Sequence, residues 1–404
     1  VKEGKVACVG SLSSDKIPDD CTVIDAEGKY VMPGLVDLHV HLREPGFEYK
    51  ETIYSGTHAM AKGGFTAVCP MPNTKPVTDS PAMIEKILKI AKTDSPIHVY
   101  PVGAVTKGQQ GEEMADIAGM VKAGAKAISE DGKSVMNAEI YREAMKEAKK
   151  AGIPVLAHCE DKNMVGHGAM NAGKKAKELG ICGITNAVED VIVARDILLA
   201  KETGVHLHLC HCSTKDSVKM VRIAKEDGVS VSAEVCPHHF AMTEDEIAGD
   251  DANYKMNPPL RSAADVGALV DGLADGTMEA ISTDHAPHAE EEKKQSIAKA
   301  PFGIVGSETA YALSVTHLVK TGKLTPLQLV EKMSTNPCRI LSVPGGTLSV
   351  GAPADITIAD MDSEYVIDKN TFLSKGKNTP FDGAKVNGRV YYTIVGGNIV
   401  YQYE

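Results

Sequence analysis

The sequence lacks the features that define several large classes of protein. It has no run of about 18 apolar residues and no charged-then-apolar leader, so we expect a cytoplasmic protein that does not span a membrane. Its 43 lysine and arginine residues are outnumbered by 54 aspartate and glutamate residues, and the net charge is -11. This balance argues against nucleic acid or an anionic membrane as the main partner. An anionic substrate would need a local cationic pocket.

Paired cysteine motifs, repeats and low-complexity linkers are also missing. The nine cysteines include no Cys-x-x-Cys pair, which is typical of reduced, buried thiols in a cytosolic protein. The hydrophobic share of 43% and the charged share of 24% exclude disorder and indicate an ordinary globular protein. A chain of 404 residues can hold a barrel of roughly 250 residues and an accessory domain.

Short apolar runs rich in Val, Ile and Ala alternate with segments of helical periodicity, as in βαβ units with a parallel sheet. Eight such runs predict an α/β fold, a closed TIM-like (β/α)8 barrel over residues 33–345. A doubly wound open sheet would bind ligands at one switch point, whereas polar residues here follow nearly every run. The eight runs are 36–42, 65–71, 97–103, 125–130, 153–159, 205–212, 229–236 and 278–284.

The two ends of the chain have a different pattern, with alternating strand-like residues and turns. Residues 1–32 and 346–404 are predicted to form a small β-sandwich together. Gly396-Gly397-Asn398 is typical of a hairpin turn between two strands of the tail. The segment Lys2 to Lys5 also has the pattern of a hairpin turn, and we therefore expect a strand to precede Val1.

His39 and His41 stand one residue apart at the end of the first apolar run. Side chains of a strand alternate between its faces, so these two imidazoles point the same way. With the cationic Arg43 two residues further on, the pair suits a divalent metal and an anionic substrate beside it. A His-x-His pair alone is a weak signal, because most such histidines are hydrogen-bonded or lie on the surface.

Further candidate ligands follow other runs. Asp131 follows the fourth run, His158 ends the fifth, His211 ends the sixth and Asp284 ends the eighth. The carboxyl ends of barrel strands meet at one rim, where barrel enzymes place their active sites. Four imidazoles and two carboxylates suit one or two zinc-like ions better than calcium or magnesium. Asp284 would act both as a ligand and as a general base.

Each candidate has a structural explanation when it is considered alone. A turn would account for Asp131 and Asn257, a helix cap would account for Asp284, and a lone histidine is more often structural. The conjunction of six potential ligands, each at the end of a separate strand except for the paired His39 and His41, favours a metal site. His238 and His239, after the seventh run, lack such support and have the weaker case for a metal or substrate role.

Two motifs in this set closely resemble the signatures of dihydroorotases in the amidohydrolase superfamily. They are Asp37-Leu38-His39-Val40-His41-Leu42-Arg43-Glu44-Pro45-Gly46 and Ser282-Thr283-Asp284-His285-Ala286-Pro287-His288. The resemblance covers nearly the whole chain and is to the long, bacterial-type class. It implies one or two Zn²⁺ ions per subunit, with Asp284 as the catalytic base. The implied metal ligands are His39, His41, Asp131, His158, His211 and Asp284.

The same resemblance implies the substrate and the partners. The reaction would be the reversible cyclisation of N-carbamoyl-L-aspartate to L-dihydroorotate in pyrimidine biosynthesis. Arg43, Asn73 and His288 would bind the free carboxylate of the substrate. Asn257 and the backbone around Phe302 and Gly303 would hold the ring. A homodimer is the family's usual form, and docking to aspartate carbamoyltransferase is open.

The chain departs from many cyclic amidohydrolases at one position, and two other functions compete with the one that the resemblance implies. Many cyclic amidohydrolases bridge their metals with a carboxylated lysine on the fourth strand, where this chain has Ser129. Asp131 would take that role, or Glu130 would exchange with it. The competitors are a sibling cyclic amidase, such as a hydantoinase (dihydropyrimidinase) or an allantoinase, and a non-catalytic scaffold homologue. Residues 289–306 are either a mobile loop over the substrate or a solvated connection.

Overall fold

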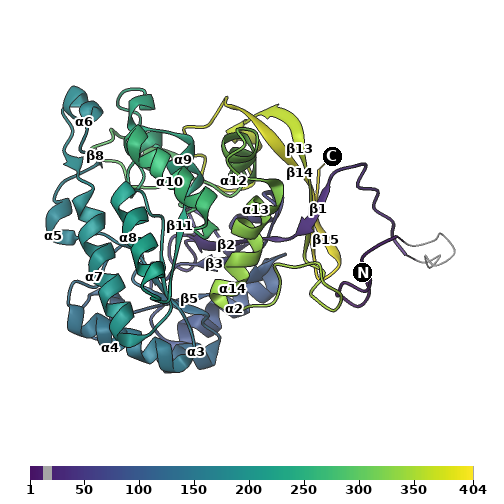
Figure 1. Cartoon of the computed structure of the whole chain (residues 1–404), viewed down its shortest axis with the longest axis horizontal. Helices are drawn as coiled ribbons and strands as arrows, with labels where there is room; N and C mark the ends of the chain where they lie inside the picture. The colour runs from purple at the N-terminus through teal and green to yellow at the C-terminus, as the bar shows by residue number, and fades with distance from the viewer. Residues whose placement is uncertain (12–20, 404) are drawn as a thin grey trace.

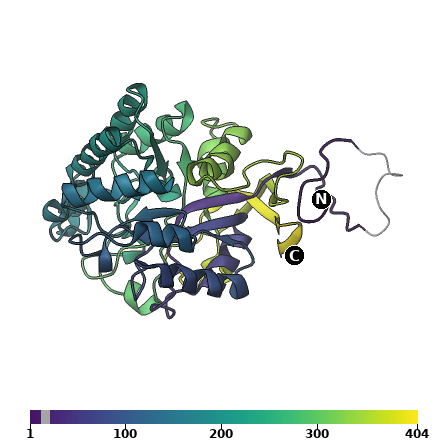
Figure 2. The same ribbon diagram turned by 90° about the horizontal axis from the view of Figure 1, so that it is seen from below.

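The structure is a computed structural model that describes residues 1–11 and 21–403. A ring of helices surrounds a parallel barrel, and an antiparallel sheet lies at one end of the molecule, close to both chain termini (Figure 1). The view from below shows the same arrangement, with strands inside the helices and the sheet beyond them (Figure 2). The polar ends of the barrel strands are the part of this fold that positions the candidate site.

All eight predicted runs form barrel strands. The third run contains two short strands that follow one another, β4 and β5, separated by residues 100–101. The strands are β2 (Leu35–Val40), β3 (Phe65–Pro70), β4 (His98–Val99), β5 (Val102–Ala104), β6 (Ala127–Ser129), β7 (Val155–Ala157), β10 (Leu207–Leu209), β11 (Val231–Val235) and β12 (Ala280–Ile281).

The strands close into a barrel through two joined sheets. One sheet has the order β12-β11-β10-β7-β6-β5 and the other has the order β2-β3-β4, with parallel pairing throughout. Since β4 continues into β5, the sheets meet there. The opposite seam closes where the His41 N–H donates to the carbonyl of His285 at 2.8 Å. The predicted (β/α)8 barrel is confirmed, and the open sheet is excluded.

Amphipathic helices cover the barrel between successive strands. In α4, Tyr141, Ala144, Met145 and Ala148 are buried, at the spacing of one helical face. Asn137 caps the helix at its first residues. The helices between strands are α1 (Ile53–Lys62), α2 (Pro81–Asp94), α3 (Ile117–Ala123), α4 (Ala138–Ala151), α7 (Ala187–Thr203), α8 (Lys215–Glu226) and α10 (Ala263–Asp275).

Shorter elements are inserted after individual barrel strands or follow the last one. A two-stranded sheet of β8 (Met170–Asn171) and β9 (Gly183–Ile184) lies in the segment between β7 and α7. The short helices are α5 (Lys162–Val165), α6 (Lys174–Leu179), α9 (Pro237–Ala241), α11 (Glu290–Lys293), α12 (Ala310–Ser314), α13 (Pro326–Val330) and α14 (Asn336–Leu341).

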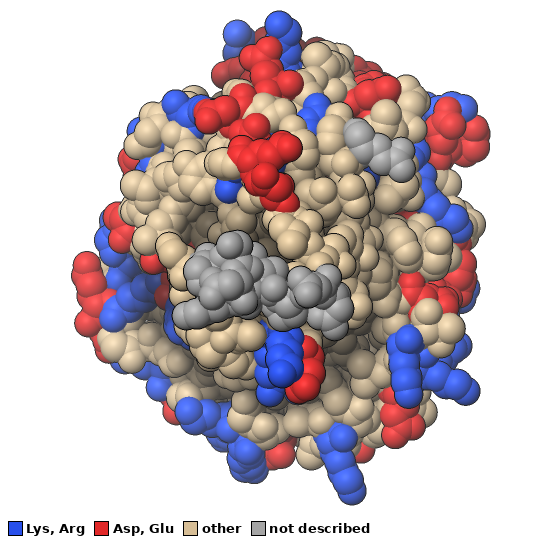
Figure 3. Space-filling model, turned by 90° about the vertical axis from the view of Figure 1, so that its right-hand side faces the viewer, with Lys and Arg blue, Asp and Glu red and all other residues tan. Residues whose placement is uncertain are grey.

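Both ends of the chain contribute to a small β domain, as predicted. Its described strands form one antiparallel sheet in the order β1-β13-β14-β15. The expected hairpin turn at residues 396–397 joins β14 to β15. Basic and acidic side chains are interspersed on the end of the molecule that carries this sheet (Figure 3). The strands are β1 (Tyr30–Pro33), β13 (Ile356–Val366), β14 (Lys385–Val395) and β15 (Asn398–Gln402).

Two expectations about composition can be checked in the described residues. All nine cysteines are free thiols, and six of them are buried. Among the helices in residues 1–11 and 21–403, none is long and apolar enough to cross a membrane.

Candidate metal centre

The six predicted ligands meet at one rim of the barrel. His41 directly follows β2, His158 directly follows β7, and Asp131 lies two residues after β6. His211 lies two residues after β10, Asp284 lies three residues after β12, and His39 lies within β2. All six side chains are buried, and three of the rim residues have a left-handed backbone, with φ of 62° at Arg43, 35° at His211 and 48° at Asp284. Such conformations concentrate at functional sites.

The ligand atoms fall into two groups that share one carboxylate. His39, His41 and Asp131 form the first group, and Asp131, His158 and His211 form the second. The Oδ1 atom of Asp131 lies 3.1 Å from His39 Nε2 and 3.4 Å from His158 Nδ1. Its Oδ2 atom lies 3.4 Å from His41 Nε2. Asp131 is therefore placed to bridge two ions.

The structure distinguishes between Asp131 and its neighbour Glu130. The Glu130 carboxylate accepts hydrogen bonds from the side chain of Thr106 and, at 3.0 Å, from its N–H. Ser129 Oγ accepts the N–H of Asp131 at 3.0 Å. Glu130 is thus occupied outside the two ligand groups, and the aspartate, not the glutamate, faces the histidines.

Asp284 completes the first group of ligands. Its Oδ1 atom lies 3.0 Å from His41 Nε2 and 3.5 Å from His39 Nε2. Burial alone would raise the pKa of this carboxyl, but the neighbouring histidines outweigh burial and lower the pKa below its usual value. The same competition, led by His39 against burial, holds the pKa of Asp131 well below its usual range. Both carboxyls are therefore ionised at neutral pH, as metal ligands must be.

Residues outside the ligand groups orient the two histidines of the first group. His39 Nδ1 lies 3.1 Å from Glu234 Oε1, and His41 Nδ1 lies 2.9 Å from Asn73 Oδ1. A carboxylate and an amide oxygen both accept, so each imidazole carries its proton on Nδ1 and presents the lone pair of Nε2 to the centre. His39 Nε2 is buried and has no hydrogen-bond partner among the described residues. A buried imidazole nitrogen without a partner fits a metal ligand.

Two of the residues predicted to bind the carboxylate of the substrate, Arg43 and His288, lie next to each other. Arg43 Nε donates to the carbonyl of Pro287 at 3.2 Å, and Arg43 Nη2 lies 3.3 Å from His288 Nε2. His288 Nε2 also lies 2.7 Å from the carbonyl of Phe302, and its Nδ1 lies 3.2 Å from Lys50 Nζ. Burial and the nearby Arg43 lower the pKa of His288, so its imidazole is neutral.

A cavity of about 150 Å³ opens between these residues and the ligand groups. Asn257 reaches it from the loop after α9, where its Nδ2 donates to Glu160 at 2.5 Å. Phe302 and Gly303 also line it. His39 and His288 do not line this cavity directly: each contacts a residue that does. The lining residues are His41, Arg43, Asn73, Asp131, Gly132, His158, His211, Asn257, Asp284, Ala286, Phe302 and Gly303.

His238 and His239 lie outside this cavity. Both are buried next to Cys236, and His239 Nε2 donates to the carbonyl of Pro258 at 2.9 Å. That bond fastens the loop that carries Asn257. A structural contact therefore accounts for His239.

The sequence patterns missed Glu234 and Asn378. Glu234 also accepts from His208 Nε2 at 2.9 Å, so it holds two imidazoles inside the barrel. A fully buried carboxylate inside an apolar run was the available signal for it. Asn378 binds the residues around His288 from the small β domain, and no local pattern marks it.

Comparison with known proteins agrees with this geometry. Residues 28–217 match the family model described as "Dihydro-orotase-like". The chain is 52% identical to a dihydroorotase from Pelotomaculum thermopropionicum, over 100% of this chain and 93% of that relative. It is 52% identical to a dihydroorotase from Staphylococcus aureus, over 94% of this chain and 90% of the relative. The chain belongs to the dihydroorotase family.

Solved structures of other cyclic amidohydrolases share the fold of this dihydroorotase-family chain. L-Hydantoinase (dihydropyrimidinase) from Arthrobacter aurescens superposes with a TM-score of 0.88 at 29% identity, over 100% of this chain and 91% of that chain. Dihydropyrimidinase from Brevibacillus agri superposes with a TM-score of 0.85 at 24% identity, and this comparison supports a shared fold only. The barrel with a terminal β domain is therefore common to these enzymes, whereas sequence identity is much higher with the dihydroorotases.

Proposed function

We propose that this chain is a metal-dependent dihydroorotase, a hydrolase of cyclic amides that interconverts N-carbamoyl-L-aspartate and L-dihydroorotate in pyrimidine biosynthesis. The observation that carries the choice of substrate is Arg43. Its guanidinium lines the cavity, donates to the carbonyl of Pro287 and lies beside the neutral His288, and no carboxylate lies within ion-pair distance of it in the described part of the chain.

A half-buried guanidinium without an anionic partner suits a ligand that brings a carboxylate. Dihydroorotate carries such a group outside its ring, whereas hydantoin and allantoin do not. Asn73 also lines the cavity, and its Nδ2 donates to Asp131 at 3.3 Å. Arg43, Asn73 and His288 would then bind the carboxylate, while Asn257 and the backbone of Phe302 and Gly303 would hold the ring.

The six ligands suit Zn²⁺, because neutral imidazoles and carboxylates are its usual ligands. His39, His41, Asp131 and Asp284 would hold one ion, and Asp131, His158 and His211 would hold a second. A metal bound there would polarise the reacting carbonyl and lower the pKa of water toward neutrality.

Asp284 would move the proton. In ring opening its ionised carboxylate would take a proton from the attacking water and deliver it to the ring nitrogen whose bond to the carbonyl breaks. In ring closure the same proton would travel in reverse. The neighbouring histidines keep the pKa of Asp284 low and its carboxylate ionised despite burial, and the 3.0 Å contact with His41 Nε2 fixes its orientation.

The test is turnover of L-dihydroorotate by the purified protein, followed by ultraviolet absorbance, with hydantoin and allantoin assayed alongside. We expect the protein to turn over dihydroorotate but neither of the other two rings, and a chelator to stop this turnover. Turnover of only the other two rings would point to a sibling amidase. No turnover of any substrate after zinc is added would favour a scaffold.

Four further properties belong to the proposal because the family implies them. They are zinc as the ion, a homodimer as the working form, the cytoplasm as the location and docking to aspartate carbamoyltransferase. Metal analysis, sedimentation and co-elution with the transferase test the ion, the dimer and the docking. We also propose the division into a barrel of residues 33–345 and a β domain of residues 1–32 and 346–404.

A further inference from the structure

We propose that Asn378 is a positioning residue, supplied by the small β domain, that holds His288 and Gly303 in place for the substrate. The proposal rests on the proposed function, because it concerns how that same site binds its ligand. It assigns the β domain a part in substrate binding.

The side-chain amide of Asn378 joins two loops of the barrel rim. Its Oδ1 atom accepts the N–H of His288 at 3.0 Å. Its Nδ2 atom donates to the carbonyl of Ala286 at 3.1 Å and to the carbonyl of Gly303 at 3.0 Å. The N–H of Val305 donates to the backbone carbonyl of Asn378 at 3.0 Å. One buried residue therefore links the loop after β12 to the loop that carries Phe302 and Gly303.

The chemistry of these bonds requires an amide. The side chain must accept one hydrogen bond and donate two, which a carboxylate, an alkyl group or a hydroxyl does not do. Asn378 is 3% exposed, so water cannot readily replace the bonds that a substitution removes. The residue is thus matched to its three partners by both shape and polarity.

The two loops are packed so closely that their relative position is sensitive to a small shift. Gly303 has φ of 148°, in the region that favours glycine. A Cβ atom there would lie 2.6 Å from the carbonyl oxygen of Ala286 and 2.9 Å from the His288 ring. His288 Nε2 in turn lies 2.7 Å from the carbonyl of Phe302. The Asn378 amide lies beside this contact and forms hydrogen bonds with both loops.

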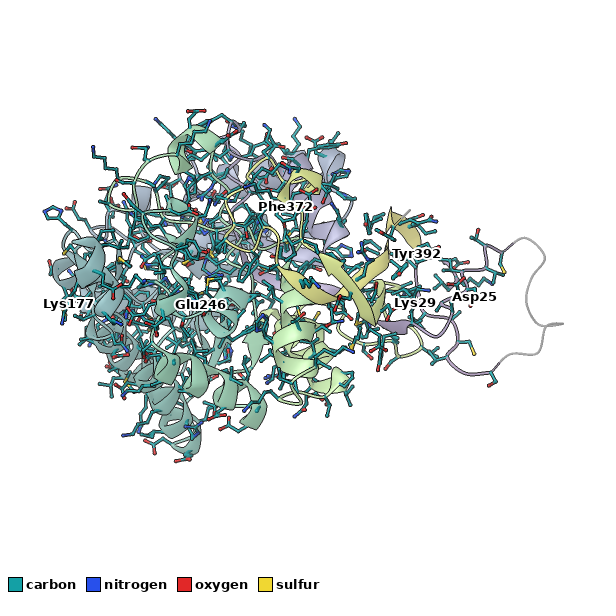
Figure 4. All side chains as sticks on the ribbon, turned by 90° about the horizontal axis from the view of Figure 1, so that it is seen from above. Asp25, Lys29, Lys177, Glu246, Phe372 and Tyr392 are labelled. Carbon is teal, nitrogen blue, oxygen red and sulfur yellow. The ribbon has the colours of Figure 1, made fainter. Side chains whose placement is uncertain are left out.

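The segment that carries Asn378 is fixed independently of any ligand. Lys377 Nζ donates to the carbonyls of Phe372 and Ser374 at 2.6 and 2.8 Å, which closes the segment on itself. Ser374 Oγ donates to the buried Glu51 of the barrel. Figure 4 shows Phe372, at the start of this segment, apart from Tyr392 of the terminal sheet. Asn378 is therefore held in position before substrate arrives.

The test compares Asn378→Ala and Asn378→Asp with Asn370→Ala, an exposed position in the same segment whose side-chain amide donates to Asp368 at 2.9 Å. Steady-state kinetics on dihydroorotate and hydrogen exchange of peptides covering residues 286–306 are measured on each full-length protein. We expect Asn378→Ala to raise KM about tenfold or more, with a smaller change in kcat, and to speed exchange in both loops. Asn370→Ala should change neither quantity.

The aspartate variant separates the two loops. It keeps an acceptor for the His288 N–H but loses both donations, so exchange should rise mainly around Gly303. It also supplies the test if the alanine variant does not fold. A lower melting temperature with unchanged KM and unchanged exchange in these peptides would overturn the proposal, since it would leave Asn378 a purely structural residue. A wild-type protein that does not turn over dihydroorotate would instead refute the proposed function, and the exchange measurement would still test whether Asn378 holds the loops.

Discussion

The Nδ1 atom of His39 lies 3.1 Å from Oε1 of Glu234, so a buried carboxylate on β11 orients a histidine on β2. The other oxygen of Glu234 lies 2.9 Å from His208 Nε2 on β10. These three strands are not all neighbours in the barrel, so the side chains meet in its interior, beneath the rim. Burial alone would raise the pKa of Glu234, but its hydrogen bonds with the two imidazoles outweigh burial and lower the pKa below its usual value. An ionised carboxylate at this point holds His39 in the tautomer that presents Nε2 to a metal.

Replacement of Glu234 by glutamine should weaken metal binding without removing a ligand. The glutamine oxygen accepts a hydrogen bond less strongly than a carboxylate oxygen does. Its NH₂ group is a donor where the second carboxylate oxygen accepted, so the tautomer of His39 is no longer fixed. We expect the affinity for zinc to fall by about 10- to 100-fold, as is typical when the partner of a ligating histidine is lost. Competition with a chromophoric chelator measures this affinity. Glu226→Gln, at an exposed position on α8, is the matched control. Equal affinities in the two variants would contradict the role of Glu234.

The sequence indicated which residues meet at the barrel rim where a residue's place follows from the strand before it. Parallel strands bring their carboxyl ends to one rim, so a polar residue after an apolar run is placed by the fold itself. This is why Asp131 and His211 could be named as candidate ligands from their positions after apolar runs, taken together with the other candidates. Glu234 was hidden because a single acidic residue in a buried strand does not reveal its partner, and His39 lies 195 residues away. Asn378 was hidden because its contact with His288 spans 90 residues and depends on how the β domain sits against the barrel.

Substitutions at Asp131 and His158 should have different effects on metal content. Asp131 belongs to both ligand groups, whereas His158 belongs to only one of them. We expect Asp131→Ala to lose both ions and His158→Ala to lose one, as counted by elemental analysis after dialysis against a metal buffer. Circular dichroism checks that both variants retain the barrel. Equal losses from the two variants would show that Asp131 does not bridge.

Replacement of Arg43 by lysine should impair substrate binding more than metal binding. Lysine keeps the charge but cannot make the two parallel hydrogen bonds that a guanidinium makes with a carboxylate. We expect KM for dihydroorotate to rise by about 10- to 100-fold, which corresponds to roughly one or two charge-assisted hydrogen bonds, with unchanged metal content. Arg222→Lys, in a surface ion pair with Asp275, controls for loss of a guanidinium elsewhere. A variant whose KM stays at the wild-type value would remove the main reason for preferring dihydroorotate over hydantoin.

Replacement of Asp284 by asparagine should nearly abolish turnover while the fold persists. Asparagine has almost the same shape and still offers an oxygen to the first ligand group, but its amide cannot accept a proton at neutral pH. Loss of a general base lowers the rate by a factor of about 10² to 10⁴, so kcat should fall by that factor or more. Dihydroorotate turnover is measured together with metal content, and Asp271→Asn, at an exposed position on α10, serves as the control. If metal content stays at the wild-type level while kcat collapses, the loss belongs to proton transfer. If kcat remains within a few-fold of wild type, another group carries the proton and Asp284 is a ligand only.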